Sequence, residues 1–491
     1  MKTVFAQSRP NRQGVMPARP ASSKFSGVTA AMFLPEELLR KTPPALPQLA
    51  ELDVVRHFTG LSRLNYSVDG NFYPLGSCTM KYNPKFAEVA AALPGFTAAH
   101  PLLAQLPGGE DMVQGSLEVI WETEKLLCEL NGMDAFTLQP MAGAQGELTG
   151  ALLIAAYHKA KNNKKTKIIC PDSAHGTNPA SAALAGYEVI NLKSRDDGLV
   201  DPDALAELLD DEVAALMMTC PNTLGLFEKH LPALVQKLRA VDALLYYDGA
   251  NLNAIMGRMR VGDVGFDVVH LNLHKTMSTP HGGGGPGSGP VGVSARLTPF
   301  LPGPRVVKNT GSADSTFALN YDLPQSIGQV TPFYGHFGVY IKALAYLLRL
   351  GGEGLSRASD YAVLNANYMR KRLENHLAVP YSDLCMHEFA ASATAYEASG
   401  VRALDIAKAL LDKGYHAPTI YFPLIVKECL MFEPTETESK ETLDRFCDDL
   451  LNILEQARKD PDALHAAPVS LPVRRLDETR AAREMVLSDE L

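Results

Sequence analysis

Residues 243–276 read ALLYYDGANLNAIMGRMRVGDVGFDVVHLNLHKT, and this stretch decides the fold. It contains two apolar runs, Ala243–Tyr247 and Val268–Leu273, and polar residues follow each run at once. A short continuous apolar run is typical of a strand that is buried on both faces, as in a parallel sheet covered by helices. Residues at the carboxyl ends of such strands meet at one edge of the sheet. The sequence therefore places Asp248 and Lys275 at the same edge.

The alternation of strands and helices extends outward from this stretch. Further strand-like runs are Ala135–Leu138, Lys167–Cys170, Tyr187–Asn191 and Ala214–Met218. Helical patterns cover Gly115–Leu130, Glu147–Lys161 and the residues after Asp201-Pro202, where Asp201 can cap the helix and Pro202 suits its first turn. Strands that alternate with helices predict an α/β fold built on a parallel sheet.

The pattern of the chain changes on both sides of this α/β region. Residues 1–100 are Pro-rich and weakly periodic, so we expect an extended N-terminal arm that lies across a neighbouring subunit. Residues 101–330 form the predicted large α/β domain. The remaining residues, 331–491, are predicted to form a smaller α+β domain. The elements expected there are helices at Gly338–Leu350 and Arg357–His376, a strand region at Ala417–Leu424 and a charged helix from Glu438 onward.

The composition excludes several classes of function. The chain has 491 residues, of which 21% are charged, and its formal net charge is −9. This charge offers no electrostatic footprint for nucleic acid or for an anionic membrane surface. No apolar run approaches the ~18 residues of a membrane span. Seven cysteines without a CxxC pair or metal spacing indicate reduced thiols, so we expect a cytoplasmic protein without a metal centre.

A loop of small residues follows the first predicted strand. It reads Ala142-Gly143-Ala144-Gln145-Gly146-Glu147 and opens a helix. Free backbone amides and the positive end of the helix dipole favour an anion there, and small residues let a phosphate approach the backbone. A single loop of this kind is more often a plain glycine turn than an anion site. The residues at the other strand ends are needed to choose between these two interpretations.

Those strand ends carry an acid, an amine and an imidazole. A carboxylate such as Asp248, buried at a strand end, needs a cationic partner. It could pair with a pyridinium nitrogen, bind Mg²⁺ or cap a turn. Apolar surroundings favour the neutral amine that Lys275 needs for Schiff-base chemistry. His175 offers a ring that could stack on a planar cofactor, although a lone loop histidine is more often a surface residue. Together with the small-residue loop, this set matches what pyridoxal phosphate (PLP) requires.

A glycine-rich run after Lys275 resembles the motif of a dinucleotide-binding site. Gly287-x-Gly289-x-x-Gly292 formally matches a dinucleotide fingerprint. Prolines interrupt the run, and it leads into the strand-like Pro290–Val293 instead of a helix, as the fingerprint would require. We interpret it as a lid or an anion nest near Lys275.

One ten-residue run carries a family resemblance. Phe72–Lys81, reading FYPLGSCTMK, resembles the signature of the glycine decarboxylase P-protein family. Other runs agree with this family in the same order along the chain: Val54–His57, Gly143–Glu147, Pro221–Phe227, Tyr247–Asn253, His274–Thr276 and Phe432–Lys440. The chain is most similar to the second subunit of the two-subunit bacterial form.

The resemblance implies a fold type I, aspartate-aminotransferase-like PLP enzyme. It implies decarboxylation of glycine and transfer of the aminomethyl group to the lipoyl arm of H-protein. Lys275 is then the Schiff-base lysine, Asp248 the partner of the pyridinium nitrogen and His175 the residue stacked on the ring. Ala144 and Gln145 belong to the phosphate cup. The expected cofactor-binding set is completed by Gly143, Ala250 and His274.

The resemblance also implies partners: P-protein subunit 1, in a heterotetramer with two copies of each subunit, and lipoylated H-protein. The residues alone leave decarboxylation, transamination, aldol cleavage and desulfuration open. A non-catalytic scaffold subunit is an alternative of another class. A scaffold has no need to keep Lys275 together with an acid and a phosphate turn, so the residues favour an enzyme.

Overall fold

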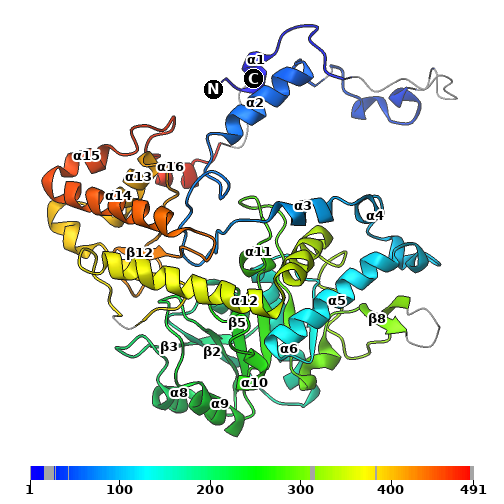
Figure 1. Ribbon diagram of the computed structural model, residues 1–491. Coiled ribbons are helices and arrows are strands. Elements are labelled where there is room, and N and C mark those ends of the chain that lie inside the picture. Colours follow the sequence, from blue (N-terminus) through cyan, green and yellow to red (C-terminus); the bar gives the residue numbers. More distant parts are fainter. Residues whose placement is uncertain are drawn as a thin grey trace. The chain divides into compact units, whose positions relative to one another are not determined.

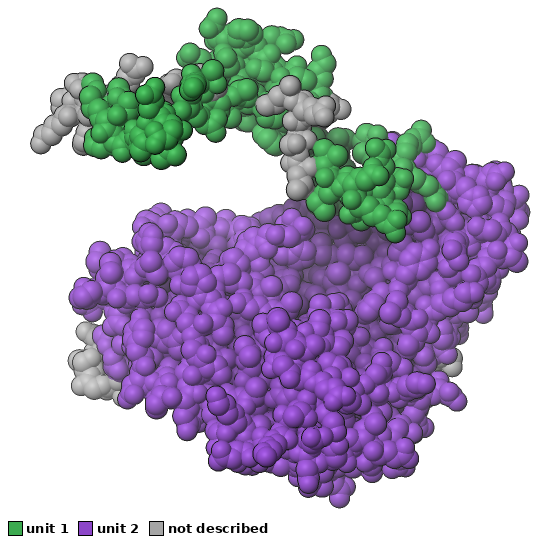
Figure 2. Space-filling view, turned by 180° about the vertical axis from the view of Figure 1, so that it is seen from behind, with its two compact units in different colours: residues 1–67, 472–491 green, residues 68–471 purple. Residues whose placement is uncertain are grey.

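The computed structural model describes residues 2–15, 27, 29–42, 44–309, 316–381 and 384–486. The chain forms two compact units, one of residues 1–67 and 472–491 and the other of residues 68–471 (Figure 2). Within the described residues of the first unit lie the helices α1 (Val4–Gln7), α2 (Glu51–Ser62) and α16 (Glu478–Arg483) and the 3-10 turns Ala30–Met32 and Glu36–Leu38. An ion pair of 2.8 Å between Arg12 and Asp53 ties the first segment of this unit to α2.

The second unit is built on a seven-stranded sheet with the order β1-β7-β6-β5-β4-β2-β3. Its strands are β1 (Ala135–Thr137), β2 (Lys167–Pro171), β3 (Glu188–Leu192), β4 (Val213–Thr219), β5 (Leu244–Gly249), β6 (Val268–Leu271) and β7 (Val291–Val293). Strands β3, β2, β4, β5 and β6 run parallel, so the predicted parallel sheet is confirmed over these five strands.

One strand of the sheet departs from the prediction. β7 pairs antiparallel with both β6 and β1. The sequence shows Pro290–Val293 as strand-like, but an apolar run carries no information on strand direction. The loop of residues 277–290 returns the chain to the sheet without a helix, so the next strand runs the opposite way.

Helices cover both faces of the sheet (Figure 1). The helices of this part of the chain are α5 (Gln114–Asn131), α6 (Gly143–Ala160), α7 (Thr177–Leu184), α8 (Pro202–Leu208), α9 (Leu231–Ala240), α10 (Val261–Val264), α11 (Leu273–Thr276) and α12 (Phe337–Leu373). Successive side chains of a strand point to opposite faces. Tyr246 of β5 accordingly packs in one apolar cluster with Ile154 of α6, whereas Tyr247 packs in another with Leu234 of α9. This two-sided burial explains the continuous apolar runs of the sequence.

The remainder of the second unit contains the predicted α+β elements. A three-stranded antiparallel sheet has the order β10 (Phe389–Ser392), β12 (Cys429–Phe432) and β11 (Thr419–Ile420). The helices α13 (Ala403–Asp412), α14 (Lys440–Lys459) and α15 (Pro461–Ala466) accompany it, and β8 (Arg305–Asn309) pairs with β9 (Thr316–Asn320) elsewhere. The two helices predicted on either side of residue 351 are present. They share the label α12 and meet at a kink at Gly351, whose φ of 61° is not helical. The three-part division at residues 100 and 330 stays a prediction.

The Pro-rich segment before residue 100 behaves differently from the prediction. Residues 68–100, with α3 (Lys85–Ala91) and α4 (Pro94–Thr97), belong to the second unit. The Gly76 amide donates to the Met431 carbonyl of β12 at 3.3 Å, and the Gly76 carbonyl accepts from the Thr419 hydroxyl at 2.7 Å. Phe72–Lys81 is thus attached to its own chain, and its expected contact with a neighbouring subunit stays a prediction. The segment lacks periodicity because hydrogen bonds, rather than an apolar stripe, hold it to its own chain.

Two properties bear on the environment of the protein. All seven cysteines are free thiols. Among the described residues, no helix combines the length and the apolar character that crossing a bilayer demands.

Candidate active site

Asp248 and Lys275 lie at the carboxyl edge of the sheet, as their strand ends predicted. Asp248 is the second-last residue of β5, which ends at Gly249. Lys275 is in the one-turn helix α11 that follows β6. Asp248 is buried and Lys275 half-buried. Burial opposes ionisation of Asp248, but His270, hydrogen bonds and the positive charge of Lys275 outweigh it and lower the pKa of this carboxyl. The site thus keeps an anion close to an amine.

The Asp248 carboxylate is held by three hydrogen bonds. The Ala250 amide donates to Oδ1 at 3.1 Å. The Asn178 side-chain amide donates to Oδ2 at 2.9 Å, and the Thr219 hydroxyl donates to the same oxygen at 3.1 Å. Ala250, which was predicted to bind the cofactor, therefore positions Asp248 through its backbone. These donors fix the direction in which the carboxylate can accept another proton donor.

The N-terminus of α6 provides free backbone donors. The first helical hydrogen bond runs from the Gly146 amide to the Ala142 carbonyl, which leaves the amides of the first three helical residues, Gly143, Ala144 and Gln145, without an intrahelical acceptor. A Cβ on Gly143 would lie 2.6 Å from Oδ1 of Asn272, so only glycine fits. Ala142 and Ala144 are exposed. These are the features of an anion cradle.

The side chain of Gln145 and its backbone amide have different roles. Its oxygen accepts from the Met141 amide at 2.7 Å, and its nitrogen donates to the Val330 carbonyl at 2.7 Å. Both ends of the side chain are thus engaged in shaping the loop. If Gln145 contacts a phosphate, its backbone amide is the available group.

His175 lies half-buried just before α7. Its Nδ1 is 2.7 Å from the Thr177 hydroxyl, which in turn donates to Oε1 of Glu147 at 2.7 Å. Burial lowers the pKa of His175, Asp248 opposes this and Lys275 reinforces it. A neutral ring that is oriented from one nitrogen is suited to stacking on a planar group.

His274 precedes Lys275 and organises the glycine-rich run. Its Nδ1 accepts from the Ser288 amide at 3.1 Å, and its ring lies edge-on to that of His281 at 5.4 Å. Burial, reinforced by Lys275, lowers the pKa of His274 to about 3. His274 is thus a neutral acceptor that holds the Ser288 amide close to the residue that precedes Lys275.

A second carboxylate, that of Glu147, lies near Asp248, and the sequence did not reveal it. Glu147 of α6 and His270 of β6 are buried, and Nε2 of His270 lies 3.4 Å from Oδ1 of Asp248 and 3.9 Å from Oε1 of Glu147. Burial, reinforced by Asp248, raises the pKa of Glu147 to about 7. Burial lowers the pKa of His270 to about 4. Spacing could not reveal this group, because its members come from three separate elements.

The segment that carries the family signature closes one side of the site. Thr79 donates to Glu433 through its amide at 3.0 Å and its hydroxyl at 2.6 Å. Asn251, three residues after Asp248, also donates to Glu433 at 2.9 Å. Burial raises the pKa of the Cys78 thiol, and the charge of Lys275 opposes this. The segment therefore lies near Lys275, where it can restrict access of water.

The arrangement fits PLP in its choice of donors. The α6 amides suit a phosphate, the buried Asp248 suits a protonated ring nitrogen and Lys275 supplies a primary amine. Two buried oxygens, Oδ1 of Asn178 beside Asp248 and Oδ1 of Asn272 beside Gly143, have no hydrogen-bond partner in the described part of the chain. Both oxygens need a hydrogen donor, which a bound water or a polar ligand would supply.

Comparisons with known proteins agree with this geometry. Residues 358–470 match the family model "Glycine dehydrogenase, C-terminal domain". A relative from Caldanaerobacter subterraneus subsp. tengcongensis, named "Probable glycine dehydrogenase (decarboxylating) subunit 2", is 57% identical over 93% of this chain and 92% of its own length.

Solved structures agree on the fold. A crystal structure of glycine decarboxylase (P-protein) of the glycine cleavage system is similar with a TM-score of 0.75 at 20% identity, covering 89% of this chain and 100% of the other. A sphingosine-1-phosphate lyase from Burkholderia pseudomallei is similar with a TM-score of 0.61 at 16% identity, covering 87% and 94%. The fold is that of fold type I PLP enzymes. The chain belongs to the glycine dehydrogenase (decarboxylating) subunit 2 family.

Proposed function

We propose that this chain is the PLP-dependent subunit of glycine dehydrogenase (aminomethyl-transferring), EC 1.4.4.2. It decarboxylates glycine and passes the aminomethyl group to the lipoyl arm of H-protein. The observation that carries the proposal is the meeting of Lys275, Asp248 and the α6 N-terminus at one sheet edge, in a chain of this family. The proposal places the protein in the cytoplasm.

Each residue of the site has a defined task in this proposal. The amides of Gly143, Ala144 and Gln145 hold the phosphate. Asp248 would hold a proton on the ring nitrogen, and the His175 ring would be available to stack on the cofactor. When bound, PLP supplies an electron sink for the pair of electrons that carbon dioxide leaves behind.

Lys275 would supply the primary amine that holds the cofactor covalently. His274 would hold the neighbouring loop in place through the Ser288 amide. The segment around Cys78 and Thr79 would exclude water from the reacting carbon of the substrate. Such exclusion prevents a solvent proton from ending the reaction before the transfer.

The partners are subunit 1 of the same enzyme, in a heterotetramer with two copies of each subunit, and lipoylated H-protein. The family name "subunit 2" supports a partner subunit. The scaffold alternative is disfavoured, since a scaffold has no need for a buried acid and a lysine at the same sheet edge. Another fold type I activity, such as transamination, is the remaining alternative.

The decisive experiment is exchange of labelled carbon dioxide into glycine. It uses the chain together with subunit 1 from the same organism, PLP and lipoylated H-protein. We expect exchange that requires glycine and the lipoyl group. Release of glyoxylate with an added oxo acid as amino acceptor, and no exchange, would favour transamination instead.

A further inference from the structure

Three buried polar side chains near Asp248 have no role in the proposed reaction. Glu147, His270 and Tyr246 come from α6, β6 and β5, and all three are at most 4% exposed. Their polar atoms meet within reach of the Asp248 carboxylate on the side remote from its Asn178 and Thr219 donors. Buried polar groups cost free energy unless they are paired, so their gathering here needs a reason.

The Tyr246 hydroxyl fixes the tautomer of His270. The hydroxyl lies 2.6 Å from Nδ1 of His270. Nε2 of the same ring makes no hydrogen bond within the described residues, but it lies 3.4 Å and 3.9 Å from two carboxylate oxygens. The negative charge there attracts a nitrogen that carries hydrogen and repels a lone pair. Nδ1 is then the acceptor and Tyr246 the donor. A Cβ on Gly150 would lie 2.4 Å from the Tyr246 ring, so the helix above holds this ring in place.

The two carboxylates share one polar neighbour in a dry site. If both were ionised, two negative charges would face a single neutral imidazole. Mutual repulsion and desolvation make this costly, so one proton is retained by the pair. Asp248 accepts three hydrogen bonds, whereas Glu147 accepts two, from Thr177 at 2.7 Å and Ser181 at 3.3 Å. The proton therefore resides on Glu147.

We propose that Glu147, His270 and Tyr246 form a proton-holding group that keeps a single negative charge, on Asp248, opposite the ring nitrogen of the cofactor. The proposal rests on the proposed PLP site and names positioning residues within it. The raised pKa of Glu147 agrees with the geometry. The titratable and charged groups that face Glu147 are Asp248, His270, His175, Lys275, Tyr246 and Cys170.

The same residues could be considered as metal ligands, because Glu147, Asp248 and His270 bring their ligand atoms within 4.8 Å of one another. The hydrogen bonds argue against a cation. Hydroxyl and amide donors already occupy both carboxylates. The tautomer inferred for His270 puts a hydrogen, and not a lone pair, on the nitrogen that faces them. The three residues are therefore suited to holding a proton and not a metal ion.

The test is a pH titration of the visible absorbance of the PLP-loaded protein. In the wild type, ionisation of Glu147 adds a negative charge beside Asp248, so we expect a step near pH 7. Glu147→Gln should lose this step and keep any other. Tyr246→Phe removes the donor that holds Nε2–H toward the carboxylates, so the step should move to higher pH by roughly half a unit to one unit.

Tyr247→Phe is the matched control. Tyr247 is the next residue of β5, equally buried, and its hydroxyl donates to the Cys220 carbonyl on the other face of the sheet. It should leave the titration step in place. If Glu147→Gln does not fold, the comparison of Tyr246→Phe with Tyr247→Phe decides alone.

A second readout needs no cofactor. The infrared difference spectrum of the apoprotein across neutrality should contain the carbonyl band of a carboxylic acid that is lost in Glu147→Gln. An unchanged step and an unchanged band in that variant would overturn the inference while leaving the PLP site intact. A wild type that takes up no PLP would instead refute the proposed function.

Discussion

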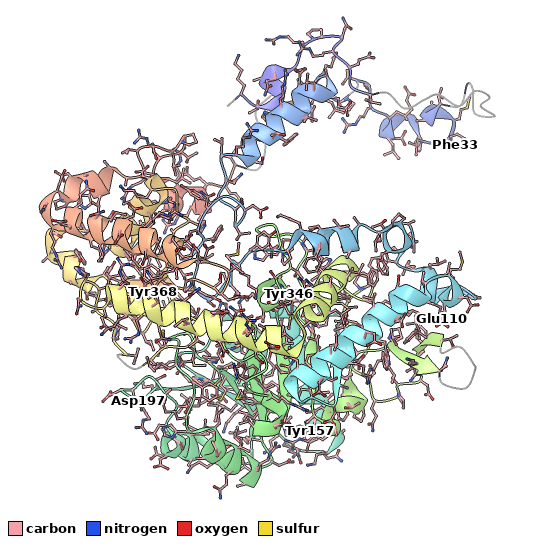
Figure 3. The ribbon with its side chains drawn as sticks, in the orientation of Figure 1. Phe33, Glu110, Tyr157, Asp197, Tyr346 and Tyr368 are labelled. Carbon is pink, nitrogen blue, oxygen red and sulfur yellow. The ribbon has the colours of Figure 1, made fainter. Side chains whose placement is uncertain are left out.

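The ammonium nitrogen of Lys81 lies 2.7 Å from Oε1 of Glu436, and the two side chains are only 1% and 9% exposed. Lys81 also donates to Oδ1 of Asn253 at 2.9 Å and to the hydroxyl of Tyr346 at 3.2 Å, so each of its three hydrogens has an acceptor. Tyr346 belongs to α12 (Figure 3). One lysine thus joins the family-signature segment, the loop after Asp248 and α12.

Lys81→Met should lower the free energy of unfolding by about 3–5 kcal/mol, because it leaves a buried carboxylate without a counter-charge. Lys85→Met is the matched control. Lys85 pairs with Asp69 at 2.6 Å, but both side chains are more than half exposed, and such a pair contributes no more than about 1 kcal/mol. Denaturant unfolding of the apoproteins measures both. Equal losses in the two variants would contradict a structural role for the buried pair.

Lys275→Ala should abolish covalent attachment of the cofactor while leaving part of its non-covalent binding, since the α6 amides and Asp248 remain. Borohydride reduction of the PLP-loaded wild type, followed by peptide mass spectrometry, should locate the label on Lys275. Lys342→Ala provides the control, because Lys342 is also shielded, at 19% exposure, but pairs with Glu88 instead. A label that persists in Lys275→Ala would assign the reactive amine to another lysine.

Asp248→Asn should weaken PLP binding at least about tenfold, which corresponds to ~1.4 kcal/mol. It should lower turnover by about two to three orders of magnitude, because the ring nitrogen loses the charge that keeps it protonated. Asp267→Asn tests whether any buried aspartate has this effect. Asp267 is buried at the opposite end of β6 and pairs with Arg239 at 3.1 Å. Its variant should lose stability but keep the wild-type cofactor spectrum.

The strands were predictable because burial on both faces leaves a local signature. Each predicted run from Ala135 to Leu273 corresponds to a strand, with ends that differ by one or two residues. Strand direction leaves no such signature, which is why the antiparallel β7 was missed. The start of α6 was missed as well, since Gly143 to Gly146 resemble a turn when the sheet beneath them is unknown.

The site residues that directly follow strands could be predicted from the sequence, and the other site residues could not. Asp248 and Lys275 follow apolar runs directly. His270 lies within an apolar run and Glu147 within a helix, so each looks like an ordinary core or surface residue until the fold brings them to Asp248. Thr79 and Glu433, 354 positions apart along the chain, pair only because the Pro-rich segment folds back onto β12.

The first unit shows where a partner could attach. Leu52, Val55 and Phe58 recur at intervals of three along α2, and each is 54–57% exposed. Residues three apart are neighbours on a helix surface, so they form a continuous apolar strip. Exposed apolar strips of this kind mark protein interaction sites. The family name "subunit 2" makes subunit 1 the expected occupant.

The chain alone should bind PLP but exchange carbon dioxide with glycine at no useful rate until subunit 1 is added. The site has its cofactor donors within this chain, so binding needs no partner, whereas a partner is expected to complete the exclusion of water from the reacting carbon. Phe58→Ser should weaken assembly with subunit 1, measured by analytical ultracentrifugation, and leave PLP binding unchanged. Lys459→Ser, exposed at the end of α14, should alter neither. Full exchange by the isolated chain would refute an obligate hetero-oligomer, and normal assembly of Phe58→Ser would move the contact away from α2.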